Sequence, residues 1–251
     1  MSASPYWPLP PAPLTLGSEE VHVWRAPLDA TASQIEKLLE TLAPDEQRRA
    51  ERYHFRRDRE HFIVARGVLR EILSRYLGLA PGQLGFCYNA YGKPALDSTI
   101  GTDMLRFNLS HSHGLALYAI TRAREVGVDL EQVRPDFACE QIARQFFSTR
   151  EVAALRRLPA GMKVAGFFNC WTRKEAYIKA RGEGLALPLD GFAVSLTPGE
   201  PAALLTSQEF EPEGRWSLRA LDPGPGYVAA LAVEGHDWRL NRWQWVREGS
   251  L

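Results

Sequence analysis

The sequence predicts an α+β fold made of two halves of comparable build. The predicted order of elements, a strand, then helices, then strands, occurs twice along the chain, although the sequence contains no strict internal repeat. The chain has 251 residues, and a chain of that length buries roughly 75% of its unfolded surface without needing a disulfide or a structural metal. We expect a proline-rich arm at 1–18, an N-terminal half at 19–122 and a C-terminal half at 123–251.

The N-terminal half is expected to open with a strand at 21–24, where apolar and polar residues alternate. A helix follows from Thr31 to about residue 42, and a proline with two acids at 44–46 is typical of a new helix start. The helical pattern then continues to Leu77, with a break near 56–58, and Gly78 is the expected stop.

Strands dominate the rest of both halves. Residues 85–89 predict a short strand, and 106–121 predict a β-hairpin with a polar tip. The C-terminal half is expected to contain a strand at 125–133, a helix near 142–147, a capping box at 148–151 that explains Glu151, a long helix at 162–181, and antiparallel strands from 192 to 245.

Composition excludes several classes of protein. Thirty basic and thirty acidic residues give zero formal net charge, which argues against a nucleic-acid binder. The chain has no apolar run as long as a membrane-spanning helix, and the N-terminal residues lack the features of a signal peptide. Three cysteines in no paired spacing are expected to be reduced and buried. We therefore expect a cytoplasmic protein that binds neither nucleic acid nor membrane.

Three acids stand in two local patterns that suit a metal-assisted phosphoryl transfer. Asp129 and Glu131 lie two apart in a predicted strand, so their side chains project to the same face. Glu175 and Lys179 lie four apart in a predicted helix, where they are neighbours. Carboxylates beside a lysine favour a hard cation next to a phosphate. As an isolated surface pair, Glu175 and Lys179 would contribute only about 0.2 to 0.5 kcal/mol.

Other polar residues suit an anionic ligand. Arginines are frequent between residues 48 and 70, and guanidinium groups bind phosphate through paired hydrogen bonds, although exposed arginine is also the default. Gly92 and Pro94 present Lys93 on a rigid turn. Ser110 and His111 lie at the hairpin tip, where they could bind phosphate or, alternatively, act as nucleophile and base of a hydrolase. Adjacent strand residues point to opposite faces, which disfavours the hydrolase.

The motifs together resemble the Sfp-type 4′-phosphopantetheinyl transferase family. The four that carry the resemblance occur in the family's order: Gly92-Lys93-Pro94; Phe107-Asn108-Leu109-Ser110-His111-Ser112; Gly127-Val128-Asp129-Leu130-Glu131; and Trp171-Thr172-Arg173-Lys174-Glu175-Ala176-Tyr177-Ile178-Lys179 with Gly184-Leu185. The similarity covers roughly 21–196, is thin in the C-terminal strands and is absent from the proline-rich arm. It implies a pseudo-twofold pair of α+β halves with the active site in the cleft between them.

The resemblance also implies an activity, a magnesium cofactor and a set of site residues. The phosphopantetheine arm of coenzyme A would move to a serine of an apo acyl, polyketide or peptidyl carrier protein, releasing adenosine 3′,5′-bisphosphate. The matching magnesium ligands are Asp129, Glu131 and Glu175; the matching coenzyme A contacts are Lys93, Ser110, His111 and Lys179, joined by Arg49 and Arg66 at the 3′-phosphate. Glu46 stands where the family often has a second basic residue.

Roles follow for two of these residues. Glu175 is the expected base for the carrier serine, and Lys179 would offset charge on the departing oxygen. The alternative, from a different class, is a coenzyme A-binding or carrier-docking module without turnover; three carboxylates argue against it, since binding alone does not require them. The length of the chain favours a monomer.

Overall fold

The computed structural model describes residues 7–98, 104–137, 139–206 and 214–246. The N-terminal half contains β1 (Glu20–Pro27), α1 (Ala32–Thr41), α2 (Pro44–Glu51), α3 (Arg56–Leu77), the 3-10 turn η1 (Pro81–Gln83), β2 (Phe86–Tyr88), β3 (Pro94–Leu96), β4 (Leu105–Ser112) and β5 (Leu115–Arg122). The C-terminal half contains β6 (Val126–Gln132), α4 (Cys139–Phe146), α5 (Thr149–Arg157), α6 (Ala160–Arg181), η3 (Gly184–Ala186), η4 (Leu189–Gly191), β7 (Ala193–Val194), β8 (Leu204–Thr206), β9 (Trp216–Leu221), β10 (Tyr227–Glu234) and β11 (Arg239–Gln244).

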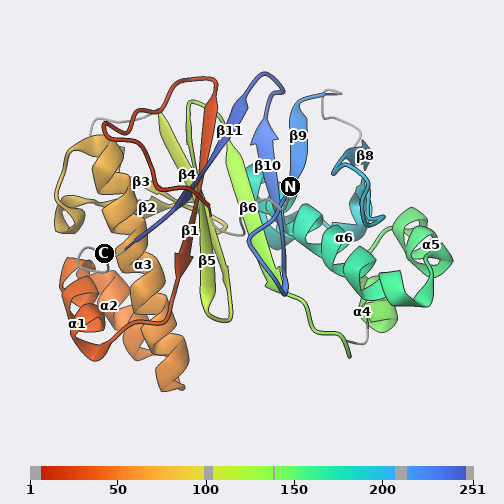
Figure 1. The fold of residues 1–251 in the computed structure, drawn as a ribbon, viewed down its shortest axis with the longest axis horizontal. Coiled ribbons are helices and arrows are strands. Elements are labelled where there is room, and N and C mark those ends of the chain that lie inside the picture. Colours follow the sequence, from red (N-terminus) through yellow and green to blue (C-terminus); the bar gives the residue numbers. More distant parts are fainter. Residues whose placement is uncertain (1–6, 99–103, 138, 207–213, 247–251) are drawn as a thin grey trace.

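The two halves form four layers, helices, sheet, sheet and helices, which confirms the predicted α+β class (Figure 1). The first sheet has the strand order β11-β1-β5-β4 and the second has β6-β10-β9. Helices α1 to α3 cover the outer face of the first sheet, and α6 covers the outer face of the second. Each half contributes one helix of 22 residues, α3 or α6, and each of these ends at a glycine in the left-handed region, Gly78 or Gly182.

Three apolar cores separate these layers. Strand alternation divides β1 between two of them: Trp24 and Ala26 face α3, while Val21 and Val23 face the second sheet. β6 places Val128 and its alternate neighbours in the same central core between the sheets. The inner faces of the two sheets therefore pack against each other through the central core. Their outer faces contact the helices and also carry the polar residues described below.

One long-range pairing ties the halves together. β11 runs parallel to β1, with Val23 opposite Arg242, so the last described strand belongs to the first sheet. A division at residue 122 assigns β11 to the C-terminal half, whereas its hydrogen bonds place it in the sheet of the N-terminal half. Strand pairing of this kind depends on contacts more than 200 residues apart, which local sequence patterns do not encode.

The described part of the proline-rich arm, 7–18, packs against the body of the protein. Trp7 is buried in the central core and its indole nitrogen donates to the Asp222 carbonyl at 2.9 Å. The Pro8 carbonyl accepts from the Gln244 amide at 2.8 Å, and Leu16 packs in the first core. Aromatic and aliphatic side chains among the prolines supply this anchoring.

All three cysteines are free, as predicted, but the prediction that they are buried is wrong for one of them. Cys139 and Cys170 are buried free thiols, whereas Cys87 is exposed. Cys87 lies on β2, which pairs only with β3 in a two-stranded sheet, and so small a sheet leaves part of its surface to solvent. No described helix is long and apolar enough to cross a membrane.

Candidate active site

Three acidic side chains come near one another from two elements of the C-terminal half. Asp129 and Glu131 project from one face of β6, opposite to Val128 and Leu130 in the central core. Glu175 lies on α6, and the negative charges of Asp129 and Glu131 both act on it. The strand and the helix thus place the three residues that the sequence suggested as metal ligands within electrostatic range of one another.

The contact between α6 and β6 depends on a glycine. A Cβ atom built on Gly127 would lie 2.9 Å from the Cα of Ala180 and closer still to the carbonyl oxygen of Ala176 and the amide nitrogen of Ala180. Carbon atoms in contact prefer about 3.5 to 4.0 Å, so only glycine permits this approach of helix backbone to strand. The motif that contains Asp129 and Glu131 therefore also sets the distance to Glu175.

Asp129 is the buried centre of the acidic group, with 4% of its surface exposed. Its Oδ1 accepts from the Lys179 ammonium at 2.6 Å and from the Ser110 hydroxyl at 2.9 Å. Its Oδ2 is buried and has no hydrogen-bond partner among the described residues. A buried carboxylate oxygen without a partner is costly, and a cation is the ligand that would satisfy it.

The charged forms of the other two carboxyl groups, Glu131 and Glu175, are disfavoured in the folded protein. Burial, followed by the negative charge of Asp129, raises the pKa of Glu131, although the Ser112 hydroxyl and Lys179 oppose the shift. Burial and Asp129 likewise raise the pKa of Glu175. Lys179 offsets only one of the three negative charges, so the group favours an added positive charge.

The donor chemistry fits a hard divalent cation such as magnesium, which prefers carboxylate oxygens. Within 7–98, 104–137, 139–206 and 214–246, however, no group of three His, Cys, Asp or Glu side chains is gathered closely enough to form a ready-made metal site. In this structure the Lys179 ammonium, 2.6 Å from Asp129 Oδ1, supplies the positive charge at the acidic group.

A cavity of about 280 Å³ brings together five of the predicted coenzyme A contacts. It is lined by Arg49, Arg66, Ser110, His111 and Lys179, which come from both halves. Desolvation, and after it the positive charge of Lys179, lowers the pKa of His111, so the ring is neutral at pH 7. The cavity thus has positive charge from its arginines and lysine, and its lining also includes the aromatic side chains of Phe62 and Tyr88.

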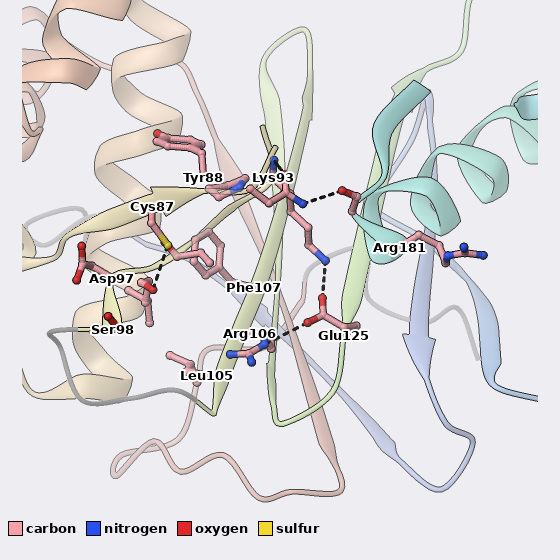
Figure 2. A pocket seen from close by; sticks show the side chains of 15 residues that line it. Cys87, Tyr88, Lys93, Asp97, Ser98, Leu105, Arg106, Phe107, Glu125 and Arg181 are labelled. Atoms are coloured by element: carbon pink, nitrogen blue, oxygen red, sulfur yellow. Dashed lines mark hydrogen bonds and ion pairs between the residues drawn. The ribbon is translucent and has the colours of Figure 1, made fainter. Parts of the chain in front are cut away.

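Lys93, the sixth predicted contact, lies outside that cavity. Its ammonium donates to Glu125 Oε2 at 2.6 Å and to the carbonyl oxygen of Ala180 at 2.8 Å. Figure 2 shows Lys93 and Arg106 converging on Glu125 beside a larger cavity of about 570 Å³. Lys93 also lines a second cavity of about 280 Å³ together with Glu175 and Lys179. In this structure Lys93 therefore joins the turn before β3 to the end of α6.

Glu46 has a role that the sequence did not indicate. It is buried, and its carboxylate binds Arg66 at 2.5 Å and Arg70 at 2.5 Å. Glu46 therefore holds Arg66 in place at the wall of the first cavity. The Arg66 guanidinium also donates a hydrogen bond to the Tyr88 hydroxyl at 3.1 Å. Arg49, by contrast, is exposed on α2. An acid within an arginine-rich helix was the available signal, since buried arginine needs a partner.

Lys174 is a second residue whose role differs from its neighbours in the motif. Its ammonium is fully buried, 2.8 Å from Glu151 and 2.6 Å from the carbonyl oxygens of Leu189 and Phe192. Glu151 caps α5 as predicted, because the Ser148 hydroxyl and amide bind it in a capping box. Lys174 thus anchors α6 to α5 and to the segment at Leu189 and Phe192. Its ammonium is not part of the group formed by Asp129, Glu131 and Glu175.

The hydrolase alternative lacks the hydrogen bond that it requires. The Ser110 hydroxyl donates to Asp129, while His111, the next residue on β4, lies on the other side of the strand. A nucleophilic serine needs its general base within hydrogen-bond reach. Ser110 instead accepts from Lys179 at 3.0 Å, so its hydrogen bonds belong to the acidic group.

Comparison with known proteins agrees with the geometry. A family model described as the 4′-phosphopantetheinyl transferase superfamily matches residues 125–232, and one described as 4′-phosphopantetheinyl transferase, N-terminal, matches 26–122. The chain is 46% identical over 239 residues to the 4′-phosphopantetheinyl transferase HetI of Nostoc, covering 95% of this chain and 98% of the relative. It is 26% identical over 203 residues to the Sfp enzyme of Bacillus subtilis, covering 81% and 87%. The chain therefore belongs to the 4′-phosphopantetheinyl transferase superfamily, as an Sfp-type member.

Proposed function

We propose that this protein transfers the 4′-phosphopantetheine arm of coenzyme A to a serine of an apo carrier protein, with magnesium as cofactor and adenosine 3′,5′-bisphosphate as the second product. The relatives HetI and Sfp are both 4′-phosphopantetheinyl transferases, which supports the reaction class. The observation that carries the proposal is the buried Asp129, with one oxygen held by Lys179 and the other without a partner, next to Glu131 and Glu175. Binding alone would not require such a concentration of negative charge beside a phosphate.

The linings of the two cavities of about 280 Å³ suit the two ends of coenzyme A. The first is lined by Arg49, Arg66 and neutral His111, which suit the phosphorylated nucleotide end. The second is lined by apolar side chains that include Leu109 and Ile178, which suit the pantetheine arm. Lys179 lines both cavities, so the diphosphate that connects the two ends would lie beside its ammonium.

The reaction forms one phosphorus–oxygen bond and breaks another. The serine oxygen of the carrier attacks the β-phosphorus of coenzyme A, and the bond from that phosphorus to the bridging oxygen breaks. Glu175 accepts the serine proton, and its raised pKa brings it closer to the value that suits a base at neutral pH. Lys179 stabilises the negative charge that develops on the bridging oxygen. Magnesium, held by Asp129, Glu131 and Glu175, would neutralise the diphosphate.

Two further properties belong to the proposal. The first cavity is lined by residues of both halves, Arg49 and Lys179 among them, so one chain supplies both sides of the proposed site, which supports a monomer as the active form. The three cysteines are free thiols, which supports a cytoplasmic location.

The test is to incubate the purified protein with coenzyme A, magnesium and a panel of apo acyl, polyketide and peptidyl carriers, and to weigh each carrier by mass spectrometry. We expect a gain of one phosphopantetheine on at least one carrier, and its loss when a chelator removes the metal. Glu175→Gln is expected to lose transfer while remaining folded. Coenzyme A binding without a mass gain on any carrier would identify the non-catalytic binding module instead.

A further inference from the structure

The edges of the two sheets meet at β4 and β6, which share no ladder of backbone hydrogen bonds. Three alternate side chains of β4 take the place of that ladder. Asn108 Oδ1 accepts from the Val128 amide at 2.9 Å, and Ser110 Oγ accepts from the Leu130 amide at 3.3 Å. Ser112 Oγ accepts from the Gln132 amide at 3.1 Å.

The spacing of this side-chain ladder, formed by Asn108, Ser110 and Ser112, is regular. Each acceptor binds the amide twenty positions later in the chain, so the two strands stay in one register over its length. The other edge of β6 is paired with β10, and alternate amides of a strand point to opposite edges. Without the ladder, three buried or half-buried amides would lack partners, at about 1 to 3 kcal/mol each.

The two serines do more than hold the strand. A hydroxyl has one proton to donate and two lone pairs to accept with. Ser110 donates its proton to Asp129 at 2.9 Å, and Ser112 donates its proton to Glu131 Oε2 at 3.1 Å. In both cases the hydroxyl accepts from the amide of one residue and donates to the carboxylate of the residue before it. The carboxylates are thereby tied to β4 as well as to their own strand.

We propose that Ser110 and Ser112 are positioning residues, which fix the register of β6 and direct the carboxylates of Asp129 and Glu131 toward the magnesium site. This inference rests on the proposed metal-dependent transfer. The hydroxyl of Ser110 and the ammonium of Lys179 both bind Oδ1 of Asp129, which leaves Oδ2 for the cation. Ser112 fixes one oxygen of Glu131 in the same way.

Ser112 offers the cleaner test, because it lies outside the predicted coenzyme A contacts. Ser112→Ala removes the hydroxyl, and Ser112→Thr restores one. Ser217→Ala is the control, because Ser217 lies on β9, the other edge strand of the second sheet, away from the acidic group. Its hydroxyl also both donates and accepts: it donates to the backbone carbonyls of Val233 and Gly235 and accepts from the Trp238 indole. Loss of a hydrogen bond behind a metal ligand typically weakens metal affinity about 10-fold to 100-fold.

Two measurements are needed. The first is hydrogen exchange of the Gln132 amide in the metal-free protein, which is expected to become faster in Ser112→Ala only. The second is the magnesium concentration for half-maximal transfer, with manganese binding measured directly by calorimetry. We expect Ser112→Ala to raise the half-saturation concentration and the manganese dissociation constant by about 10-fold or more. Ser112→Thr should recover most of this change, and Ser217→Ala should show none of it.

An unchanged metal affinity in Ser112→Ala overturns the proposal even if the Gln132 amide exchanges faster, because Ser112 would then only join the strands. Unchanged exchange overturns the ladder itself. If the wild-type protein neither transfers phosphopantetheine nor binds manganese, the proposed function fails, and the exchange measurement still decides whether the ladder exists.

Discussion

Replacing Gly127 by alanine should displace the helix that carries Glu175 and Lys179. The added Cβ would lie 2.9 Å from the Cα of Ala180, and nearer to two polar backbone atoms of α6. Since contacting carbons prefer about 3.5 to 4.0 Å, α6 has to withdraw by about 1 Å. The obstacle is backbone on both sides, so no change of side-chain rotamer can relieve it.

The magnitude has two parts. Overpacking of a buried contact typically destabilises a protein by about 1 to 3 kcal/mol, and a clash between backbones belongs at the upper end. A misplacement of catalytic groups by about 1 Å typically lowers the rate about 100-fold. We therefore expect Gly127→Ala to lower the free energy of unfolding by about 2 to 3 kcal/mol and the transfer rate by about 100-fold in the fraction that stays folded.

Urea unfolding and transfer kinetics with one fixed carrier measure these two effects. Gly161→Ala is the matched control, because Gly161 lies in the first turn of the same helix and its added Cβ would meet open space. Alanine there should stabilise the helix by up to about 1 kcal/mol and leave turnover unchanged. If Gly127→Ala were as stable and as active as Gly161→Ala, the close packing of α6 on β6 would be refuted.

Three further outcomes are expected. Burial raises the pKa of Glu131 and Glu175 above their ordinary value of 4.5, so the folded protein keeps these protons to a higher pH than the unfolded chain, and the metal-free protein loses stability as pH rises through the raised values. Magnesium at 100 times the dissociation constant that it has at pH 8 should add about 2.7 kcal/mol of stability at pH 8, and the same concentration should add much less at pH 4.5, where the carboxyl groups are protonated and bind the cation weakly. Thermal unfolding with and without magnesium will check this; a pH-independent gain would contradict the assignment. Lys174→Met should lower the free energy of unfolding in urea by about 3 to 5 kcal/mol, because it leaves the Glu151 carboxylate buried without its cation; a change below 1 kcal/mol would refute that pairing. Glu46→Gln should lower the free energy of unfolding by a similar amount, because two buried arginines lose their counter-charge. It should also raise the KM for coenzyme A, because Arg66 lines the first cavity. An unchanged KM would show that the cavity wall does not depend on this carboxylate.

Local sequence patterns predicted the elements well and the long-range contacts poorly. The helical break before α3, the β4–β5 hairpin and the capping box of α5 all follow from residues within a few positions of one another. The strand pairing of β6 with β10 and of β1 with β11 joins distant segments, and alternation alone does not identify a strand's partner. Proximity of Asp129 to Glu175 was therefore available from the family resemblance and not from spacing.

The same distinction applies within the site. The face shared by Asp129 and Glu131 follows from strand geometry, and the structure has it. The partner of Lys179 did not follow, because helical spacing pairs it with Glu175, whereas its ammonium binds Asp129 on another element. In the sequence Glu46 stands out only as an acid among arginines, and its two partners, Arg66 and Arg70, lie about one turn apart on a different helix. Side chains that act across elements need tertiary contacts to be assigned.

The parallel pairing of β11 with β1 has a consequence for biosynthesis. A ribosome delivers residues 20–122 long before Arg239–Gln244, so the first sheet lacks its edge strand during most of translation. The exposed edge of β1 is then open to pairing with other chains. Contacts this distant in sequence also slow folding, because a large loop must close before they form. The nascent protein should therefore depend on chaperones until residue 244 has emerged, and a stop codon before β11 should yield aggregates instead of an isolated, folded N-terminal half.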